Sequence, residues 1–316
     1  MKGKKMRSIL VFCLAALCLG GAAQAGGQPP IREVVSFGDS LSDCGAFGFK
    51  PTTAPSPIWN QIVARHYGYD LGPNWVGKPD VPHADGLEAR AGGLCYAQGG
   101  ARTAIGKPGQ PPIPGTVQLD RFLAEHGQFT DDQLVTVYLG TNDVLINFFK
   151  MNTALGKGDT ATFGATRAVV EQAAKDLAVL VRRMLDNGAK RIVVLNLYDL
   201  GATGFIQANP LLTGLTEDFN ATARAALQRD PRIIPVDTRA FFADLAANPA
   251  AHGFKHPMNE DACQTPTALG PDCYATPTKW KSPDADQTYM LVGMVHFTAR
   301  TEALLADYVL RRVGRR

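Results

Sequence analysis

The sequence predicts an α/β/α fold, in which helices cover both faces of a mainly parallel β-sheet. The strand candidates are continuously apolar instead of alternating, which is typical of strands buried on both faces. Helix-like segments separate them, as the connections between parallel strands require. No internal repeat and no linker divides the chain, so residues 26–316 are expected to form a single domain.

Each element has its own signal in the sequence. The strand candidates are four short apolar segments, at residues 33–37, 134–139, 191–197 and 232–236. The helix candidates are residues 57–66, 161–187 and 216–229, a segment that starts near Thr238, and a last one that follows Thr298. The first of these helices has proline in its first turn, and a glycine ends the second. Residues 68–116 are rich in Gly and Pro and are expected to be mostly loop.

The composition is that of a globular protein with a sizeable core. Of its 316 residues, 45% are hydrophobic and 19% are charged, which excludes an intrinsically disordered chain. The formal net charge is +3, and residues 1–25 contribute four basic side chains and no acid, so the rest of the chain carries −1. A nearly neutral chain gives no electrostatic reason to expect a nucleic-acid partner.

The N-terminus has the layout of a secretory signal peptide. A basic head precedes an apolar stretch from Ile9 to Ala23, and Ala23-Gln24-Ala25 supplies the small residues of a cleavage site after Ala25. A membrane anchor is the alternative, but the stretch is short for a span of ~20 residues. No later segment is long and apolar enough to cross a bilayer. Residues 1–25 are therefore expected to be removed, leaving an exported protein without a membrane span.

Export permits disulfide bonds among the four cysteines that remain after cleavage, Cys44, Cys95, Cys263 and Cys273. Four cysteines allow three pairings. Cys263 and Cys273 lie ten residues apart in a segment rich in Pro, Thr and Gly, where a local bridge closes easily, and Cys44 and Cys95 would then form the second pair. A metal site is the competing use of cysteine, but the chain has no C-x-x-C sequence, so no metal is expected.

Polar segments follow the first two strand candidates, Gly38-Asp39-Ser40-Leu41 and Gly140-Thr141-Asn142-Asp143. Because ligands of parallel sheets bind beyond the carboxyl ends of the strands, a functional site is expected there. Ser40 stands where an expected helix begins, and free N–H groups at that point can stabilise an anion formed on an attacked carbonyl. The same position suits a helix N-cap, and the residue types alone do not decide between the two.

Three further features have both a catalytic and a purely structural interpretation. The pair Gly99-Gly100 lets the backbone approach a ligand closely, but such pairs also form ordinary turns. Asn142 offers an amide donor, although asparagine is common in turns and caps. His296, at the entry to the last helix, is a candidate base, but a lone histidine is more often structural.

Together these segments resemble the GDSL, or SGNH, hydrolases, in particular secreted bacterial lipases and esterases without an autotransporter domain. The resemblance runs from about residue 33 to 310 through four blocks in order, FGDSLSD, YAQGGA, GTND and VHFT. It implies a flavodoxin-like three-layer fold with a parallel sheet of five strands. It also implies that Ser40 attacks an ester carbonyl with His296 as general base. The N–H groups of Ser40 and Gly100 and the amide of Asn142 would hold the oxyanion.

One departure from the family concerns the histidine. The family usually has Asp three residues before it, and Gly293 stands at that position here. A carboxylate there fixes the tautomer of the imidazole and stabilises the imidazolium. Three explanations follow: a backbone carbonyl near residues 292–294 orients His296 in a Ser–His dyad, Asp284 or Asp286 reaches in from upstream, or much of the activity has been lost. The dyad is preferred, because the other blocks are complete.

A second departure is that Cys44 and Cys95 stand within the first two blocks. If both blocks line one pocket, as the resemblance implies, these two cysteines lie near each other and form a disulfide beside the site.

The expected function is that of an exported serine esterase or lipase that works without a metal or an organic cofactor. Its substrate would be a small-molecule or lipid ester, bound by loops at 44–58, 144–160 and 201–215. Two alternatives remain open: a catalytically silent secreted binding protein on the same fold, which the missing aspartate motivates, and an acyltransferase that uses the same residues. The expected location is the periplasm or the medium.

Overall fold

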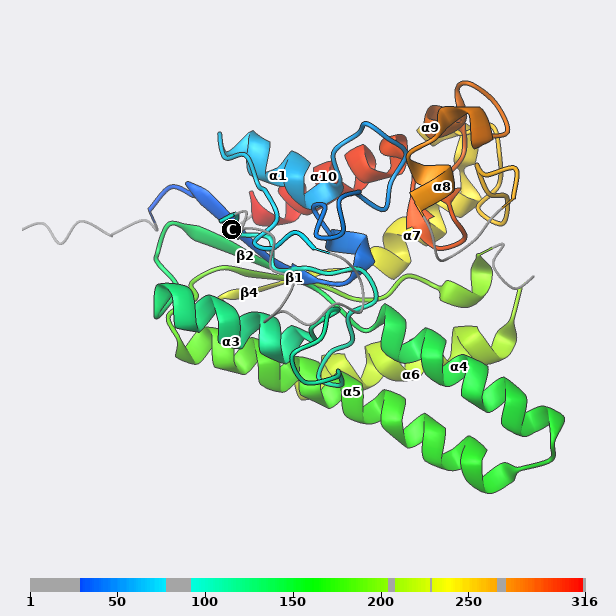
Figure 1. The fold of residues 1–316 in the computed structure, drawn as a ribbon, viewed down its shortest axis with the longest axis horizontal. Coiled ribbons are helices and arrows are strands. Elements are labelled where there is room, and N and C mark those ends of the chain that lie inside the picture. The colour runs from blue at the N-terminus through cyan, green and yellow to red at the C-terminus, as the bar shows by residue number, and fades with distance from the viewer. Residues whose placement is uncertain (1–28, 78–91, 204–207, 228, 266–270, 315–316) are drawn as a thin grey trace, which may run out of the picture.

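The computed structural model describes residues 29–77, 92–203, 208–227, 229–265 and 271–314. The predicted signal peptide lies outside these described residues. Helices lie on both sides of a central sheet (Figure 1). The α/β/α fold class predicted from the apolar strands is therefore confirmed.

The sheet contains four parallel strands in the order β1 (Glu33–Gly38), β2 (Gln133–Tyr138), β3 (Ile192–Leu195) and β4 (Ile233–Val236). β1 and β2 pair along their full length, from Glu33 opposite Gln133 to Gly38 opposite Tyr138. This register brings the carboxyl ends of β1 and β2 to the same level, one strand apart. The two polar segments that follow these strands are thus neighbours in space.

The expected count of five strands is wrong for a specific reason. A segment around Cys95 runs parallel to β1 on its outer side. The N–H of Ser36 donates to the carbonyl of Leu94 (2.9 Å), and the N–H of Tyr96 donates to the carbonyl of Ser36 (2.8 Å). The next ladder bond would come from the N–H of Gly38, but that group donates to Oε1 of Gln118 (3.0 Å). The side chain of Gln118 therefore interrupts the ladder, and only an isolated bridge remains.

The helices form two groups. Contacts join α1 (Trp59–His66) to α10 (Ala299–Val313) and to β1, while α3 (Gly115–His126) packs on β1 and on α5 (Thr160–Asp186). α5 also contacts α4 (Thr141–Gly156) and α6 (Pro210–Ala226). Figure 1 shows α1 and α10 on one face of the sheet and α3, α5 and α6 on the other. No helix in the described part of the chain is long and apolar enough to span a bilayer.

Helices replace most of one expected pocket loop and the end of another. α4 occupies most of residues 144–160, and it buries Val144, Phe148 and Met151, at the spacing of one helix face. α6 begins at Pro210, not at 216, because the side chain of Asn209 accepts hydrogen bonds from the first N–H groups of the helix. The expectation of loops is therefore wrong for most of 144–160 and for residues 210–215, while residues 204–207 lie outside the described part of the chain.

A smaller subdomain stands beside the sheet near the C-terminus. It contains the short helices α8 (Pro271–Tyr274) and α9 (Ala285–Thr288) and the antiparallel pair β5 (Leu291–Val292) and β6 (His296–Phe297), and α7 (Thr238–Ala247) precedes it in the chain. Its buried residues form a hydrophobic cluster of their own: Ala262, Cys263, Cys273, Tyr274, Trp280, Ala285, Tyr289 and Val292. The candidate histidine belongs to this subdomain, whereas the candidate serine belongs to the sheet.

Candidate active site

Ser40 lies directly beyond the carboxyl end of β1. It is the first residue of η1 (Ser40–Ser42), a single 3₁₀ turn, and its side chain is partly exposed while Asp39 and Leu41 on either side are buried. Asp39 caps the turn, since its Oδ1 accepts a hydrogen bond from the N–H of Leu41 (3.0 Å). Burial raises the pKa of Asp39 to about 7. The cap fixes the turn, in which Ser40 is more exposed than its two neighbours.

Asp43 ties the serine segment to the glycine segment. One of its oxygens accepts hydrogen bonds from the N–H groups of Gly45 (2.8 Å) and Ala46 (2.6 Å), and the other accepts from the N–H of Gly99 (2.7 Å). Burial raises the pKa of Asp43 to about 6, although these three bonds act in the opposite direction. A role for Asp43 was missed in the sequence, where its only signal is an acid three residues after the candidate serine.

The glycine segment and the asparagine segment lie side by side. Nδ2 of Asn142 donates to the carbonyl of Ala101 (2.9 Å), the residue after Gly100. Gly100 has φ of +85°, a conformation that favours glycine, and it is exposed. Because a primary amide has two hydrogens, Asn142 retains a second donor after this bond. The structure thus places two of the three predicted oxyanion donors next to each other.

A further set of hydrogen bonds, made by Asp143, joins these segments. The buried carboxylate of Asp143 accepts from Nε of Arg102 (2.7 Å), from the N–H of Thr103 (2.8 Å) and from its hydroxyl (3.0 Å). Asp143 was not predicted to have a role. Its contacts keep the chain that follows Gly100 against the first turn of α4.

His296 reaches the site from the far end of the sequence. It is the first residue of β6, and the Cα atoms of β6 and η1 come within 8 Å of one another. The flanking backbone is held by two hydrogen bonds: Tyr198 donates to the carbonyl of Val295 (2.7 Å), and Thr52 donates to the carbonyl of Phe297 (2.8 Å). The candidate base is therefore held close to the turn that carries Ser40.

The imidazole of His296 is only 4% exposed. Its Nδ1 lies 2.8 Å from the hydroxyl oxygen of Tyr274, while Nε2 has no hydrogen-bond partner among the described residues. No hydrogen bond joins Ser40 to His296 within that same set. An unpartnered buried nitrogen is uncommon and calls for an explanation, and catalytic hydrogen bonds are often long until substrate is bound.

Burial lowers the pKa of His296 to about 4, and a weaker opposing effect comes from a hydrogen bond with the backbone of Gly293. The imidazole is therefore neutral at pH 7. A neutral imidazole with a free ring nitrogen is the form that can accept a proton from a hydroxyl group.

The structure does not bring Asp284 or Asp286 to His296. Asp284 is exposed and binds Nζ of Lys255 (2.7 Å), and Asp286 accepts from the side chain of Gln287 (2.8 Å). The expectation that one of them orients the histidine is wrong, because Nδ1 of His296 lies beside the hydroxyl of Tyr274 instead, and Nε2 has no partner among the described residues.

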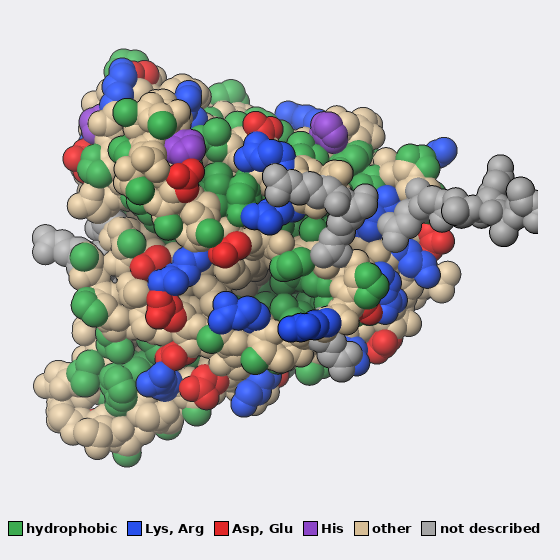
Figure 2. All heavy atoms as spheres, turned by 180° about the vertical axis from the view of Figure 1, so that it is seen from behind, with side chains coloured by type: hydrophobic (Ala, Val, Ile, Leu, Met, Phe, Trp, Pro, Cys, Tyr) green, Lys and Arg blue, Asp and Glu red, His purple; other side chains and the backbone are tan. Residues whose placement is uncertain are grey.

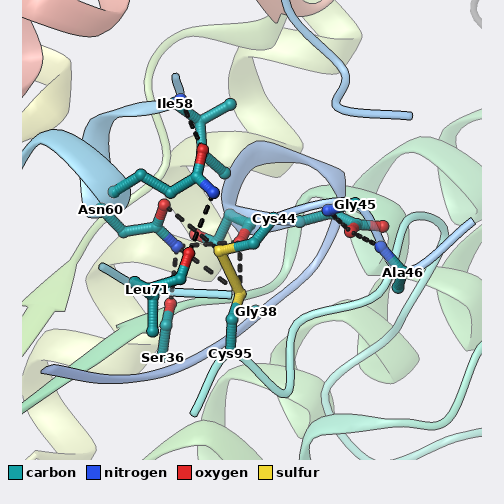
Figure 3. The surroundings of a disulfide bond; sticks show 12 residues. Ser36, Gly38, Cys44, Gly45, Ala46, Ile58, Asn60, Leu71 and Cys95 are labelled. Atoms are coloured by element: carbon teal, nitrogen blue, oxygen red, sulfur yellow. Dashed lines mark hydrogen bonds between the residues drawn. A yellow bond between two sulfur atoms is a disulfide. The ribbon is translucent and has the colours of Figure 1, made fainter. Parts of the chain in front are cut away.

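The structure joins Cys44 to Cys95 and Cys263 to Cys273. The first bond links the segment after η1 to the irregular segment beside β1 (Figure 3). Next to it, Nδ2 of Asn60 donates to Oγ of Ser36 and to the carbonyl of Ser42, both at 2.8 Å. The disulfide and this amide together fix η1 against α1 and β1.

Two hollows lie away from these residues. One, of about 590 Å³, lies beyond β3 and β4, and the other, of about 760 Å³, lies along the outer edge of β4. Figure 2, which views the molecule from behind, shows a hollow with a hydrophobic floor and basic side chains at its border. Neither is lined by Ser40, Gly100, Asn142 or His296. Among the described residues there is no group of three His, Cys, Asp or Glu side chains that could hold a metal ion.

Comparisons with known proteins give one family match over most of the chain. Residues 34–309 match the model of the GDSL-like lipase/acylhydrolase family. An uncharacterized protein in the trpE-trpG intergenic region of Pseudomonas putida is 28% identical over 95% of this chain, and the chain spans about half (51%) of that relative's length. A phosphatidylcholine-sterol acyltransferase of Aeromonas hydrophila is 24% identical over 79% of this chain and 71% of its own length.

Similar solved structures are more distant in sequence. A catalytic mutant of Axe2, an acetylxylan esterase from Geobacillus stearothermophilus, superposes with a TM-score of 0.45 at 13% identity, over 91% of this chain and 97% of the other. An extracellular lipase of Streptomyces rimosus gives 0.36 at 18% identity, over 88% and 98% of the two chains.

Replacing Asp43 is expected to cost far more than the same change at Asp39. Both oxygens of Asp43 accept backbone hydrogen bonds, so Asp43→Asn leaves at least one N–H group facing an NH₂ group and destabilises the fold by about 1–3 kcal/mol. Within the described part of the chain, Asp39 accepts a hydrogen bond with only one oxygen. The amide oxygen of Asp39→Asn can accept the same bond, and the uncharged amide resembles the protonated carboxyl group. The free energy of unfolding in urea measures the difference. Equal losses in the two variants would contradict the role given to Asp43.

The low pKa of His296 predicts an acid-stable catalytic base. Since the pKa of His296 is about 4 instead of 6.5, the imidazole stays neutral as the pH falls through 6.5, and kcat/KM for an ester substrate should decline only toward pH 4. The profile is best measured in Asp39→Asn as well, because Asp39 titrates near pH 7, and stability is followed over the same range, because Asp43 titrates near pH 6. A decline centred near pH 6.5 in both proteins, with near-ultraviolet circular dichroism unchanged, would contradict this assignment.

Proposed function

Because the chain belongs to the GDSL-like lipase/acylhydrolase family, we propose that it hydrolyses carboxylic esters through an acyl-enzyme formed on Ser40. His296 takes the proton of the Ser40 hydroxyl on Nε2 as the oxygen attacks the ester carbonyl. It then gives this proton to the leaving alcohol, and water repeats the two steps to release the acid.

The single observation that carries the proposal is the state of His296. Its Nε2 is buried and without a partner among the described residues, on a strand that packs against the turn bearing Ser40. A buried ring nitrogen without a hydrogen-bond partner destabilises the fold, and a catalytic role is one explanation for keeping it. Taking a proton from Ser40 when substrate excludes water from the turn is such a role.

The oxyanion is held by neutral donors. These are the N–H groups of Ser40 and Gly100 and the second amide hydrogen of Asn142. The contact of Asn142 with Ala101 and the contact of Asp43 with Gly99 support this assignment, since they fix the donors before substrate arrives. Donors that do not need to reorganise as charge develops contribute most to lowering the barrier.

The acyl-enzyme can also pass its acyl group to an alcohol instead of water. The Aeromonas hydrophila relative is named as an acyltransferase, which makes this the second candidate function. Both functions share the chemistry at Ser40 and differ only in the acceptor.

Export is part of the proposal. The basic and apolar N-terminus supports a secretory signal, and two disulfides fit an oxidising compartment such as the periplasm or the medium.

A fluorophosphonate probe tests the proposed nucleophile. The wild-type protein should be labelled on Ser40, as peptide mapping by mass spectrometry would show, and Ser40→Ala should not be labelled. Ser42→Ala is the matched control, because this serine lies in the same turn with its hydroxyl buried, and it should still be labelled. Asn142→Ala should lower kcat for a p-nitrophenyl ester by about 10²–10³-fold.

The opposite results separate the alternatives. A folded wild-type protein that takes up no probe would exclude the enzyme and leave the silent binding protein. A labelled protein that forms ester product from an added alcohol faster than free acid would favour the acyltransferase.

A further inference from the structure

The space beside Gly293 is filled by the ring of Tyr274. Gly293 has φ of +57°, and a Cβ atom built on it would lie 2.6 Å from the hydroxyl oxygen of Tyr274 and 2.7 Å from Cζ. An aspartate at this position, which the related hydrolases usually have, would therefore overlap the tyrosine. The tyrosine places its own oxygen 2.8 Å from Nδ1 of His296, the nitrogen that such an aspartate would contact.

We propose that Tyr274 is the positioning residue for His296, and that its hydroxyl oxygen accepts the Nδ1–H hydrogen bond in place of a carboxylate. The proposal rests on the proposed function, because it assigns a partner to the base of that reaction. In this role Tyr274 acts only through the imidazole.

The proposed reaction decides the direction of this hydrogen bond. Nε2 can receive the proton of Ser40 only if its lone pair is free, so the proton of the neutral imidazole must lie on Nδ1. Nδ1–H is then the donor, and the hydroxyl oxygen of Tyr274, 2.8 Å away, accepts.

Tyr274 is held in place from several sides. Its ring stacks on Phe49, with centroids 6.1 Å apart, and meets the ring of His296 edge-on at 5.1 Å. Its backbone carbonyl accepts from the N–H of Ala54 (2.8 Å). The preceding residue, Cys273, is bonded to Cys263. A residue so constrained can hold the imidazole in one orientation.

Asp261 connects the disulfide to the glycine turn. Its carboxylate accepts from the N–H groups of Cys263 (2.7 Å), Gly293 (3.2 Å) and Met294 (2.5 Å). The turn at Gly293 and the segment that carries Tyr274 are thus fixed to one buried acid. The sequence holds no signal for this, because Asp261 lies 35 residues from His296.

Tyr274 supplies a neutral acceptor. Burial, with a smaller effect of the charge on Asp261, raises the pKa of Tyr274 well above its ordinary value of 10, so the phenol is not ionised. A neutral oxygen orients the imidazole but offsets the cost of its positive charge less than a carboxylate does. This agrees with the low pKa of His296.

The test is Tyr274→Phe, which keeps the ring over Gly293 and removes only the oxygen. We expect kcat for a p-nitrophenyl ester to fall about tenfold, as for the loss of one neutral hydrogen bond, with KM within twofold of wild type. Nitrogen-15 spectra of the histidines should show Nδ1 of His296 protonated in the wild type and a mixture of tautomers in the variant. The matched control is Tyr96→Phe, which removes the hydroxyl of another buried tyrosine, one that donates to Glu125 (2.7 Å), and should leave kcat within twofold.

A second variant covers the case in which Tyr274→Phe does not fold. Gly293→Ala pushes a methyl group against the Tyr274 ring without removing the hydroxyl, and it should also lower kcat. Gly48→Ala is its control, since Gly48 also has positive φ (+80°) but has open space around it.

The inference is overturned if folded Tyr274→Phe keeps kcat within twofold, if only KM changes, or if the wild-type Nδ1 carries no proton. These results leave labelling of Ser40 in the wild type untouched. A wild type that is not labelled at all would instead overturn the proposed function.

Discussion

The parallel pairing of β1 with β2 is the constraint on which the site depends. It sets Ser40 and Asn142, which are about a hundred residues apart in the chain, at the same edge of the sheet, one strand apart. The other contacts described here stabilise that juxtaposition. Asp43 and the Cys44–Cys95 disulfide fasten the glycine segment to the serine turn, and Asp143 fastens it to α4. Buried carboxylates that accept two or three backbone N–H groups are suited to this, because such groups are costly to leave unpaired.

The histidine is held by a different set of contacts. It belongs to a C-terminal subdomain with its own hydrophobic cluster, its own disulfide and its own buried acid, Asp261. This subdomain surrounds the imidazole with apolar groups and offers it an uncharged oxygen from Tyr274. Burial without a facing carboxylate keeps the base neutral over a wide range of pH. The cost is that the imidazolium formed during the reaction receives less support than a carboxylate would give.

The sequence was informative where short-range rules apply. Continuous apolar runs predicted the strands around Val35, Val135 and Val193, and the four blocks pointed to Ser40, Gly100, Asn142 and His296. It failed where a distant side chain decides the outcome. The side chain of Gln118 interrupts the hydrogen bonds on the outer side of β1, and no residue near position 38 in the sequence indicates this contact. The sequence favoured a backbone carbonyl near residues 292–294 as the partner of His296, with Asp284 or Asp286 as the alternative. The contact to Nδ1 comes instead from Tyr274, which lies in a disulfide-bonded loop. The sequence does not predict α4, because the polar residues Thr141, Asn142 and Asp143 of its first turn are also typical of a loop.

The central claim is that folding places the hydroxyl of Ser40 and Nε2 of His296 in one reaction centre. A crystal structure of the protein after reaction with a fluorophosphonate tests it most directly. We expect phosphorus bonded to Oγ of Ser40, a phosphonyl oxygen within hydrogen-bond distance of the Gly100 N–H and of Nδ2 of Asn142, and Nε2 of His296 facing Oγ. An adduct on another residue, or an imidazole turned away from Ser40, would contradict it.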